Sequence, residues 1–240
     1  MYHGGKQRIG KELANVIFNN IKPDYEIQGY CEPFCGMLGV YQHMPKLFKE
    51  QNLSYKAGDT QGSIIKMWQE IQNGWVPPIS CSEERYNELK KEEESSAEQG
   101  YIGHQYSYGG QYFKAFVGKY KGRTIKPNVS EKVCRIGKEL EMVDFTHGSY
   151  TQFRNLKNYV IYCDPPYANT RCYYNKDYSK FKFDNTSFWN WCREMSKDNI
   201  VFISEYNAPE DFECIYEKEK KNNIFKYKTT GTEKIFTLKT

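Results

Sequence analysis

The chain has 240 residues, a length that suits one domain or one catalytic domain that carries a small insert. Its four histidines are scattered and its eight cysteines form no Cys-x-x-Cys pair, which argues against a metal site and for free thiols. No apolar run is long enough to span a bilayer and no basic-then-apolar leader precedes the chain, so we expect a cytoplasmic protein that avoids membranes.

The first elements in the chain alternate between helix and strand. Apolar residues at helical spacing predict a helix over 6–21, and the apolar run 27–31 predicts a buried strand. A second strand is expected over 54–57, with Asp59 just beyond it. A helix follows around residues 64–71. This order is typical of the opening of a parallel, doubly wound sheet.

The middle of the chain has a different character. Residues 83–100 carry seven acids against three bases and predict a solvated helix or a mobile segment. Residues 101–138 carry eight bases against one acid, so they hold nearly all the excess positive charge of a chain whose net charge is only +4. Aromatic residues are interleaved with these bases, a pattern typical of nucleic-acid binding, although aromatics also fill cores.

The strand and helix pattern resumes in the last third of the chain. Residues 158–163 predict a strand that runs into Asp164-Pro165-Pro166-Tyr167. A helix is expected around residues 188–195 and a strand over 200–204.

The end of the chain predicts a hairpin rather than another crossover. Its expected strands are 224–228 and 234–239, joined by a turn over 229–232. The sequence therefore predicts an α/β fold with a mostly parallel sheet that ends in an antiparallel hairpin. We expect 1–80 to form the cofactor-binding half of a catalytic domain, 81–140 an insert that recognises the target, and 141–240 the catalytic half.

The tetrapeptide Asp164-Pro165-Pro166-Tyr167 suits chemistry on an amino group. An amine conjugated to a base ring is a poor nucleophile, because its lone pair is spread into the ring. A carboxylate and backbone carbonyls at a turn fixed by prolines can accept its protons, and an aromatic ring can stack on an extruded base. The carboxyl end of a strand is also where open parallel sheets bind ligands. The alternative is a tight loop that merely ends the strand.

Three further features are weak alone. The turn from Glu32 to Gly39 follows the first strand and holds glycines that let backbone approach a ligand. Asp59 is suited to hold ribose hydroxyls, although an Asp there also caps helices. Gly5 and Lys6 precede the first helix, where a carboxylate can bind, although a flexible start is an equal alternative.

The order of these motifs along the chain is more specific for one protein family than any single motif is. Gly4-Gly5-Lys6, Glu32-Pro33-Phe34-x-Gly36, Asp59 and the tetrapeptide resemble the Dam-like (alpha-class) adenine-specific DNA methyltransferases, phage-type members above all. The resemblance covers nearly the whole chain. It implies a Rossmann-like S-adenosylmethionine-dependent methyltransferase fold with a small target-recognition insert. It also implies transfer of a methyl group to N6 of an adenine flipped out of duplex DNA, with restriction-modification as one setting.

The resemblance further implies roles for single residues. Asp164, Pro165 and Pro166 would hold the target amine, and Tyr167 would stack on the base. Contacts with S-adenosylmethionine are expected from Tyr2, Gly5, Lys6, Glu32, Phe34, Gly36, Asp59, Asp144, Phe145 and Asp164. Contacts with double-stranded DNA are expected from Lys114, Lys119, Lys121 and Arg123.

Two kinds of alternative remain open. Related tetrapeptides also serve methylation of the cytosine amino group and of adenine in RNA. A catalytically silent DNA-binding relative is the alternative from another class, and the intact tetrapeptide with Lys6 argues against it.

Overall fold

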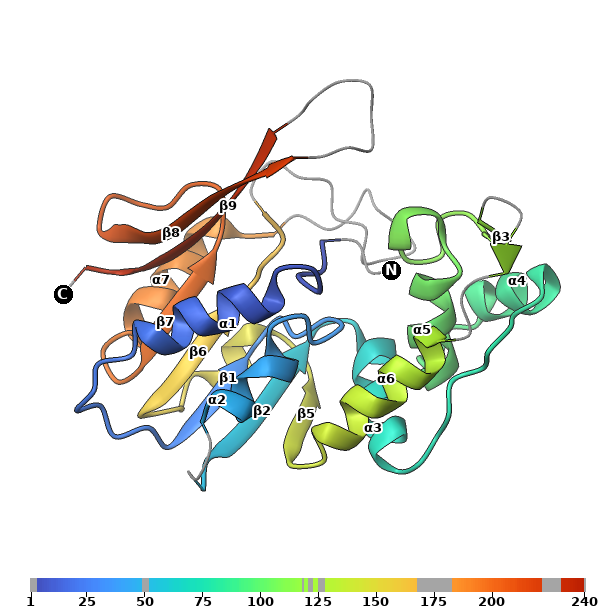
Figure 1. The fold of residues 1–240 in the computed structure, drawn as a ribbon, viewed down its shortest axis with the longest axis horizontal. Coiled ribbons are helices and arrows are strands. Elements are labelled where there is room, and N and C mark those ends of the chain that lie inside the picture. Colours follow the sequence, from blue (N-terminus) through green and yellow to red (C-terminus); the bar gives the residue numbers. More distant parts are fainter. Residues whose placement is uncertain are drawn as a thin grey trace.

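The computed structural model describes residues 4–48, 52–117, 119–120, 123–124, 128–167, 183–221 and 230–239. Its main sheet consists of β1 (Gly29–Glu32), β2 (Ser54–Asp59), β5 (Val143–His147), β6 (Tyr159–Cys163), β7 (Ile200–Ser204), β8 (Phe212–Lys221) and β9 (Thr230–Leu238). The α-helices are α1 (Gly10–Asn19), α2 (Met44–Leu47), α3 (Gly62–Gln72), α4 (Glu83–Lys91), α5 (Ala97–Gln105), α6 (Asn128–Glu139) and α7 (Asn185–Met195). Figure 1 shows the sheet crossing the larger part of the molecule, with α4 and α5 beside it.

The strand order is β5-β2-β1-β6-β7-β9-β8. Neighbours run parallel from β5 to β7, and β9 is antiparallel to both β7 and β8. The chain builds outward from β1 to β5, then returns to the other side of β1 to form β6. The carboxyl ends of β1 and β6 therefore flank the point where the direction of building reverses, which is where open α/β sheets bind ligands. The predicted fold, an α/β fold with a mostly parallel sheet and a C-terminal antiparallel hairpin, is confirmed.

Successive side chains of a strand point to opposite faces of the sheet. Both faces of this sheet carry apolar side chains, and helices cover each of them. Tyr30 and Tyr162 belong to one buried cluster, to which α1, α2 and α3 contribute. Cys31 and Cys163 belong to the other, which α7 completes. Strands covered on both faces are apolar throughout, which explains why every residue of β6 is buried.

The insert predicted over 81–140 is largely helical and packs against α3. Ser82 caps α4, and Ser96 and Gln99 form a capping box at the start of α5. Gly100 and Gly137 lie so close to α3 that a Cβ would stand 2.2 Å from the carbonyl oxygen of Ser63 and 2.3 Å from a side-chain carbon of Ile71, respectively. The segment thus shares its core with the sheet domain, and its role in target recognition remains a prediction.

The aromatic residues of the insert mostly fill that core. Tyr101, Tyr106, Tyr112 and Phe113 are each at most 6% exposed, whereas Tyr108 is 62% exposed. The acidic stretch 83–100 is not one solvated helix either. It forms α4 and the start of α5, and apolar side chains on their inner faces are buried. Charge on the outer face concealed this amphipathic pattern.

Two element boundaries differ from those predicted. The first helix begins at Gly10 rather than near residue 6, because the preceding residues form the site described below. The first strand of the hairpin is β8, and Thr230 to Thr232 belong to β9 rather than to a turn. Residues 224–228, predicted as a strand, lie outside the described residues. Among the helices that are described, none has the length and apolar character to cross a membrane.

Candidate active site

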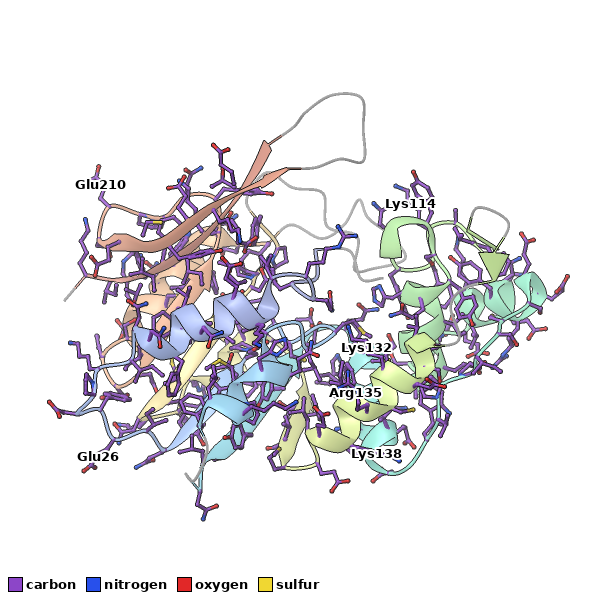
Figure 2. The ribbon with its side chains drawn as sticks, in the orientation of Figure 1. Glu26, Lys114, Lys132, Arg135, Lys138 and Glu210 are labelled. Carbon is purple, nitrogen blue, oxygen red and sulfur yellow. The ribbon has the colours of Figure 1, made fainter. Side chains whose placement is uncertain are left out.

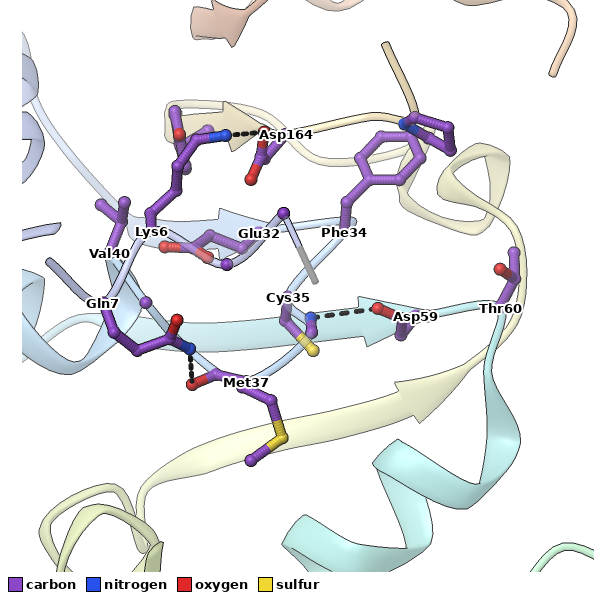
Figure 3. Close-up of a pocket in the computed structure, with 16 residues that line it drawn as sticks. Lys6, Gln7, Glu32, Phe34, Cys35, Met37, Val40, Asp59, Thr60 and Asp164 are labelled. Carbon is purple, nitrogen blue, oxygen red and sulfur yellow. Dashed lines mark hydrogen bonds and ion pairs between the residues drawn. The ribbon is translucent and has the colours of Figure 1, made fainter. Parts of the chain in front are cut away.

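A cleft lies at the carboxyl ends of β1, β2 and β6. Figure 3 shows the side chains that converge there from the N-terminal segment and from the three strand ends. The predicted residues that line it are Gly5, Lys6, Glu32, Phe34, Gly36, Asp59, Asp164 and Pro166. Motifs that are up to about 160 positions apart in the sequence therefore meet in one place.

The turn after β1 forms the floor of the cleft. The backbone N–H of Cys35 donates to the carbonyl oxygen of Gly58 at 2.9 Å. Trp68 on α3 donates its indole N–H to the carbonyl oxygen of Gly36 at 2.9 Å, and Gly36 has a φ of 44°, which favours glycine. A Cβ on Gly39 would stand only 3.0 Å from the backbone of Lys6. These contacts hold the turn against β2, α3 and the N-terminal segment.

Asp59 ends β2 and links two parts of the site. Its carboxylate accepts from the backbone N–H of Gly36 at 3.0 Å and from that of Gln61 at 2.8 Å. Burial raises the pKa of Asp59, and these two hydrogen bonds oppose the rise. Part of its role is therefore structural, since it fixes the glycine turn beside the start of α3.

Lys6 is the electrostatic centre of the cleft. Its Nζ lies 2.7 Å from Oδ1 of Asp164, 2.8 Å from the hydroxyl of Tyr167 and 3.4 Å from Oε1 of Glu233. The side chain is only 7% exposed. Burial lowers the pKa of Lys6, but Asp164 and Glu233 outweigh it and raise that pKa above its ordinary value, so the ammonium stays charged.

Tyr167 is held at its hydroxyl, a contact that the sequence did not predict. The hydroxyl accepts from Lys6 and donates to Oε1 of Glu233 at 3.0 Å. The ring of Tyr206, which follows β7, packs edge-on against the Tyr167 ring with centroids 4.7 Å apart. Burial, then the carboxylates of Asp164 and Glu233, raise the pKa of Tyr167, so its phenol stays protonated.

Acidic side chains outnumber basic ones in this cleft. Among the described residues that line it, Lys6 is the one cation, and Glu32, Asp59 and Asp164 are acids. Glu32 is 3% exposed and accepts a hydrogen bond from the Tyr30 hydroxyl at 2.7 Å. Burial raises the pKa of Glu32 well above its ordinary value, the Tyr30 hydrogen bond opposes this, and Asp164 adds to it. A ligand with positive charge and hydroxyl groups suits such surroundings.

Other predicted residues lie elsewhere. Asp144 is the second residue of β5, is 58% exposed, and pairs with Lys56 at 3.1 Å. Phe145 is buried and stacks on Trp68, with ring centroids 6.2 Å apart. Neither is among the residues that line the cleft, so their contact with a cofactor remains a prediction. Pro165 is buried beside Asp164 and does not line the cleft. Tyr2 lies outside the described residues.

The predicted DNA-binding residues all belong to the insert by sequence. Lys114 is exposed in the loop after η2 (Tyr108–Gly110). Lys119 and Arg123 belong to β3 (Lys119–Tyr120) and β4 (Arg123–Thr124), which pair antiparallel, while Lys121 lies outside the described residues. Figure 2 shows Lys114 on the insert and further bases along α6. Their contact with DNA remains a prediction.

In the described ranges, no group of three or more His, Cys, Asp or Glu side chains is placed to hold a metal ion. The thiols of the described cysteines are free, in line with the composition.

No protein-family model matches the sequence, and no curated protein matches it either. Among solved structures, the chain is similar to the proposed methyltransferase yhhF from Escherichia coli (9% identity, TM-score 0.38, 97% of this chain and 87% of that one). It is similar to the rRNA methyltransferase aviRa from Streptomyces viridochromogenes (9% identity, TM-score 0.40, 95% of this chain and 84% of that one). It is also similar to TrmN from Thermus thermophilus (9% identity, TM-score 0.40, 95% of this chain and 48% of that one). Similarity at this level does not identify an activity.

Proposed function

We propose that this protein is an S-adenosylmethionine-dependent methyltransferase that methylates N6 of an adenine flipped out of duplex DNA. The observation that carries the proposal is the position of Asp164. Its carboxylate follows β6 at the reversal point of the sheet, is 20% exposed, and faces the glycine turn that follows β1. A hydrogen-bond acceptor is thereby placed beside the cleft at the carboxyl ends of β1, β2 and β6.

The residues of the cleft fit the proposed cofactor. S-adenosylmethionine carries a sulfonium, an amino group, a carboxylate and a ribose, and when bound it would supply an electrophilic methyl group. Glu32 and Asp59 offer acceptors for the amino group and the ribose hydroxyls, and Lys6 offers a cation for the carboxylate. A lining with three acids and one base offers many hydrogen-bond acceptors and disfavours a ligand that carries phosphates.

Asp164 and the two prolines would act on the target amine. The carboxylate would accept a hydrogen bond from one N–H of the amine and a backbone carbonyl in the turn would accept one from the other, so that the nitrogen lone pair is free to face the methyl group; the one proton lost on methylation would leave toward the carboxylate. Proline residues leave the carbonyls of the turn without competing amide donors. Tyr167 offers a ring face for the base, at a place fixed by its hydroxyl contacts. Catalysis then comes from positioning and from preorganised acceptors, with no covalent enzyme intermediate.

The test is methylation of duplex DNA by wild type, Asp164→Asn and a matched surface control, Asp211→Asn, which breaks only an ion pair with Arg193. We expect Asp164→Asn to lose activity on the order of a hundredfold to a thousandfold, since one preorganised acceptor is lost. The control should retain it, because exposed ion pairs contribute little. Nucleoside mass spectrometry on DNA and RNA substrates separates N6-methyladenine in DNA from the cytosine and RNA alternatives. Near-normal methylation by Asp164→Asn would overturn the assignment.

A further inference from the structure

Glu233 stands out as a buried acid that no sequence motif marks. It lies on β9, is 2% exposed, and contacts two candidate site residues, Lys6 and Tyr167. A buried carboxylate is costly unless it is paired and hydrogen-bonded. Both of these partners line or border the cleft, so the charge belongs to the site rather than to the hairpin.

The reversal of β9 explains how this side chain reaches the cleft. β9 pairs antiparallel with β7, with Ser204 opposite Ile235. Ser204 is the last residue of β7, so Glu233, two residues before Ile235, extends past the carboxyl end of β7. Since Glu233 and Ile235 lie two residues apart, they share one face of the sheet. The face is that of Tyr162, because Ile235 and Tyr162 belong to the same buried cluster.

Lys6 and the target amine both need the carboxylate of Asp164, and the contacts of Glu233 bear on this competition. Lys6 donates to Asp164, the group that must accept the target amine. A cation held by Asp164 alone would compete with that amine for the carboxylate. Glu233 gives Lys6 a second anionic partner, and it also accepts from the Tyr167 hydroxyl.

We propose that Glu233 is a positioning residue for methyl transfer. Its carboxylate fixes the ring of Tyr167 through the hydroxyl and shares the Lys6 ammonium, which leaves Asp164 to accept the amine. This role rests on the proposed function. It differs from a merely structural ion pair, because Glu233 then acts through Tyr167 on the turnover of the enzyme.

The test is a double-mutant cycle with Glu233→Gln, Tyr167→Phe and the two combined. Each single change should lower kcat roughly tenfold, the value of one hydrogen bond to a charged group. Because both changes weaken or remove the hydrogen bond between Tyr167 and residue 233, the double variant should lose clearly less than the roughly hundredfold product of the two single losses. Calorimetry should give a dissociation constant for S-adenosylmethionine within about threefold of wild type, which separates turnover from binding. Glu217→Gln, an exposed acid on β8 paired with Lys234 at 3.6 Å, is the control and should keep the wild-type kcat.

A multiplicative loss in the double variant, or wild-type kcat in Glu233→Gln, would overturn the positioning role. A second measurement does not depend on methylation: 3-fluorotyrosine placed at position 167 should show a shifted fluorine resonance in Glu233→Gln and an unshifted one in Glu217→Gln. An unshifted resonance in both would reject the contact itself. If wild type methylates no nucleic acid while the resonance shifts, the contact stands, and the proposed function and the role in turnover both fall.

Discussion

Replacing Lys6 by methionine should destabilise the protein more than replacing Asp164 by asparagine. Lys6 Nζ lies 2.7 Å from an oxygen of Asp164 and 3.4 Å from one of Glu233, and all three side chains are at most 20% exposed. At an effective dielectric constant of about 20, these contacts correspond to roughly 6 and 5 kcal/mol before desolvation. Methionine keeps the length of the side chain but leaves two carboxylates without their shared cation.

The two substitutions differ because Lys6 has two anionic partners. Removing the partner of a buried charge costs about 3–5 kcal/mol, so Lys6→Met should lose about that much. In Asp164→Asn the ammonium keeps Glu233 at 3.4 Å. The loss there should be about 1–2 kcal/mol, the value of one weakened hydrogen bond. A chain of this size loses about 2–4 °C in Tm per kcal/mol, so Lys6→Met should melt roughly 6–20 °C lower.

The assay is urea unfolding of wild type and both variants, followed by far-UV circular dichroism and repeated at about pH 5 and pH 8. In Lys6→Met the facing carboxylates repel each other, and protonation of either relieves the repulsion. The deficit of this variant relative to wild type should therefore grow as the pH rises. If Asp164→Asn proves as unstable as Lys6→Met, or if the deficit shrinks with rising pH, then Lys6 is not the shared partner that the distances indicate.

Three further predictions concern the cofactor and the nucleic acid. Asp59→Asn should weaken binding of S-adenosylmethionine about tenfold or more in calorimetry, because a charged acceptor is lost from the cleft; unchanged affinity would reject its contact with the cofactor. Because burial raises the pKa of Glu32 above its ordinary 4.5, the contribution of Glu32 to folding stability is greatest below pH 4.5 and is lost as the pH rises through the raised value. Glu32→Gln should remove that fall, so its thermal stability should match wild type near pH 4.5 and exceed it at neutral pH, and the opposite order would contradict the assignment. Neutralising all four predicted DNA contacts should flatten the slope of log affinity against log salt by about 0.9 for each lost phosphate contact, while cofactor affinity stays unchanged; an unaltered slope would show that these bases only solvate the surface. Those four residues are Lys114, Lys119, Lys121 and Arg123.

The strands and the motifs at their ends were predictable because their signals are local. The apolar run of β6 is buried on both faces and ends at two prolines, so both its type and its end can be predicted from neighbouring residues. The same holds for β1, β2, α3 and β7, whose predicted positions agree with the structure to within a few residues. Parallel pairing brings the carboxyl ends of such strands to one edge, which is why Asp59 and Asp164 could be expected near one another.

Elements with mixed patterns were harder to predict. β5 carries an aspartate and a threonine in five residues, and its short length gives alternation little room to show. α6 has apolar residues at helical spacing, but bases on its outer face dominate its composition. The aromatics of the insert could not be assigned to core or surface from composition, because a ring suits a core as well as a base.

Tertiary structure alone decided the partners of Lys6 and Tyr167. In the sequence, Glu233 stands between Thr232 and Lys234 in a polar stretch, and nothing distinguishes it from the exposed acids of β8. It enters the site only because β9 reverses its direction beside β7 and extends past the end of that strand. A parallel strand at that place would present its carboxyl end there instead, and a different residue would face the cleft. The motifs are local in sequence, but the charge balance around them depends on which distant strand lies alongside, because electrostatic partners are set by distance in space.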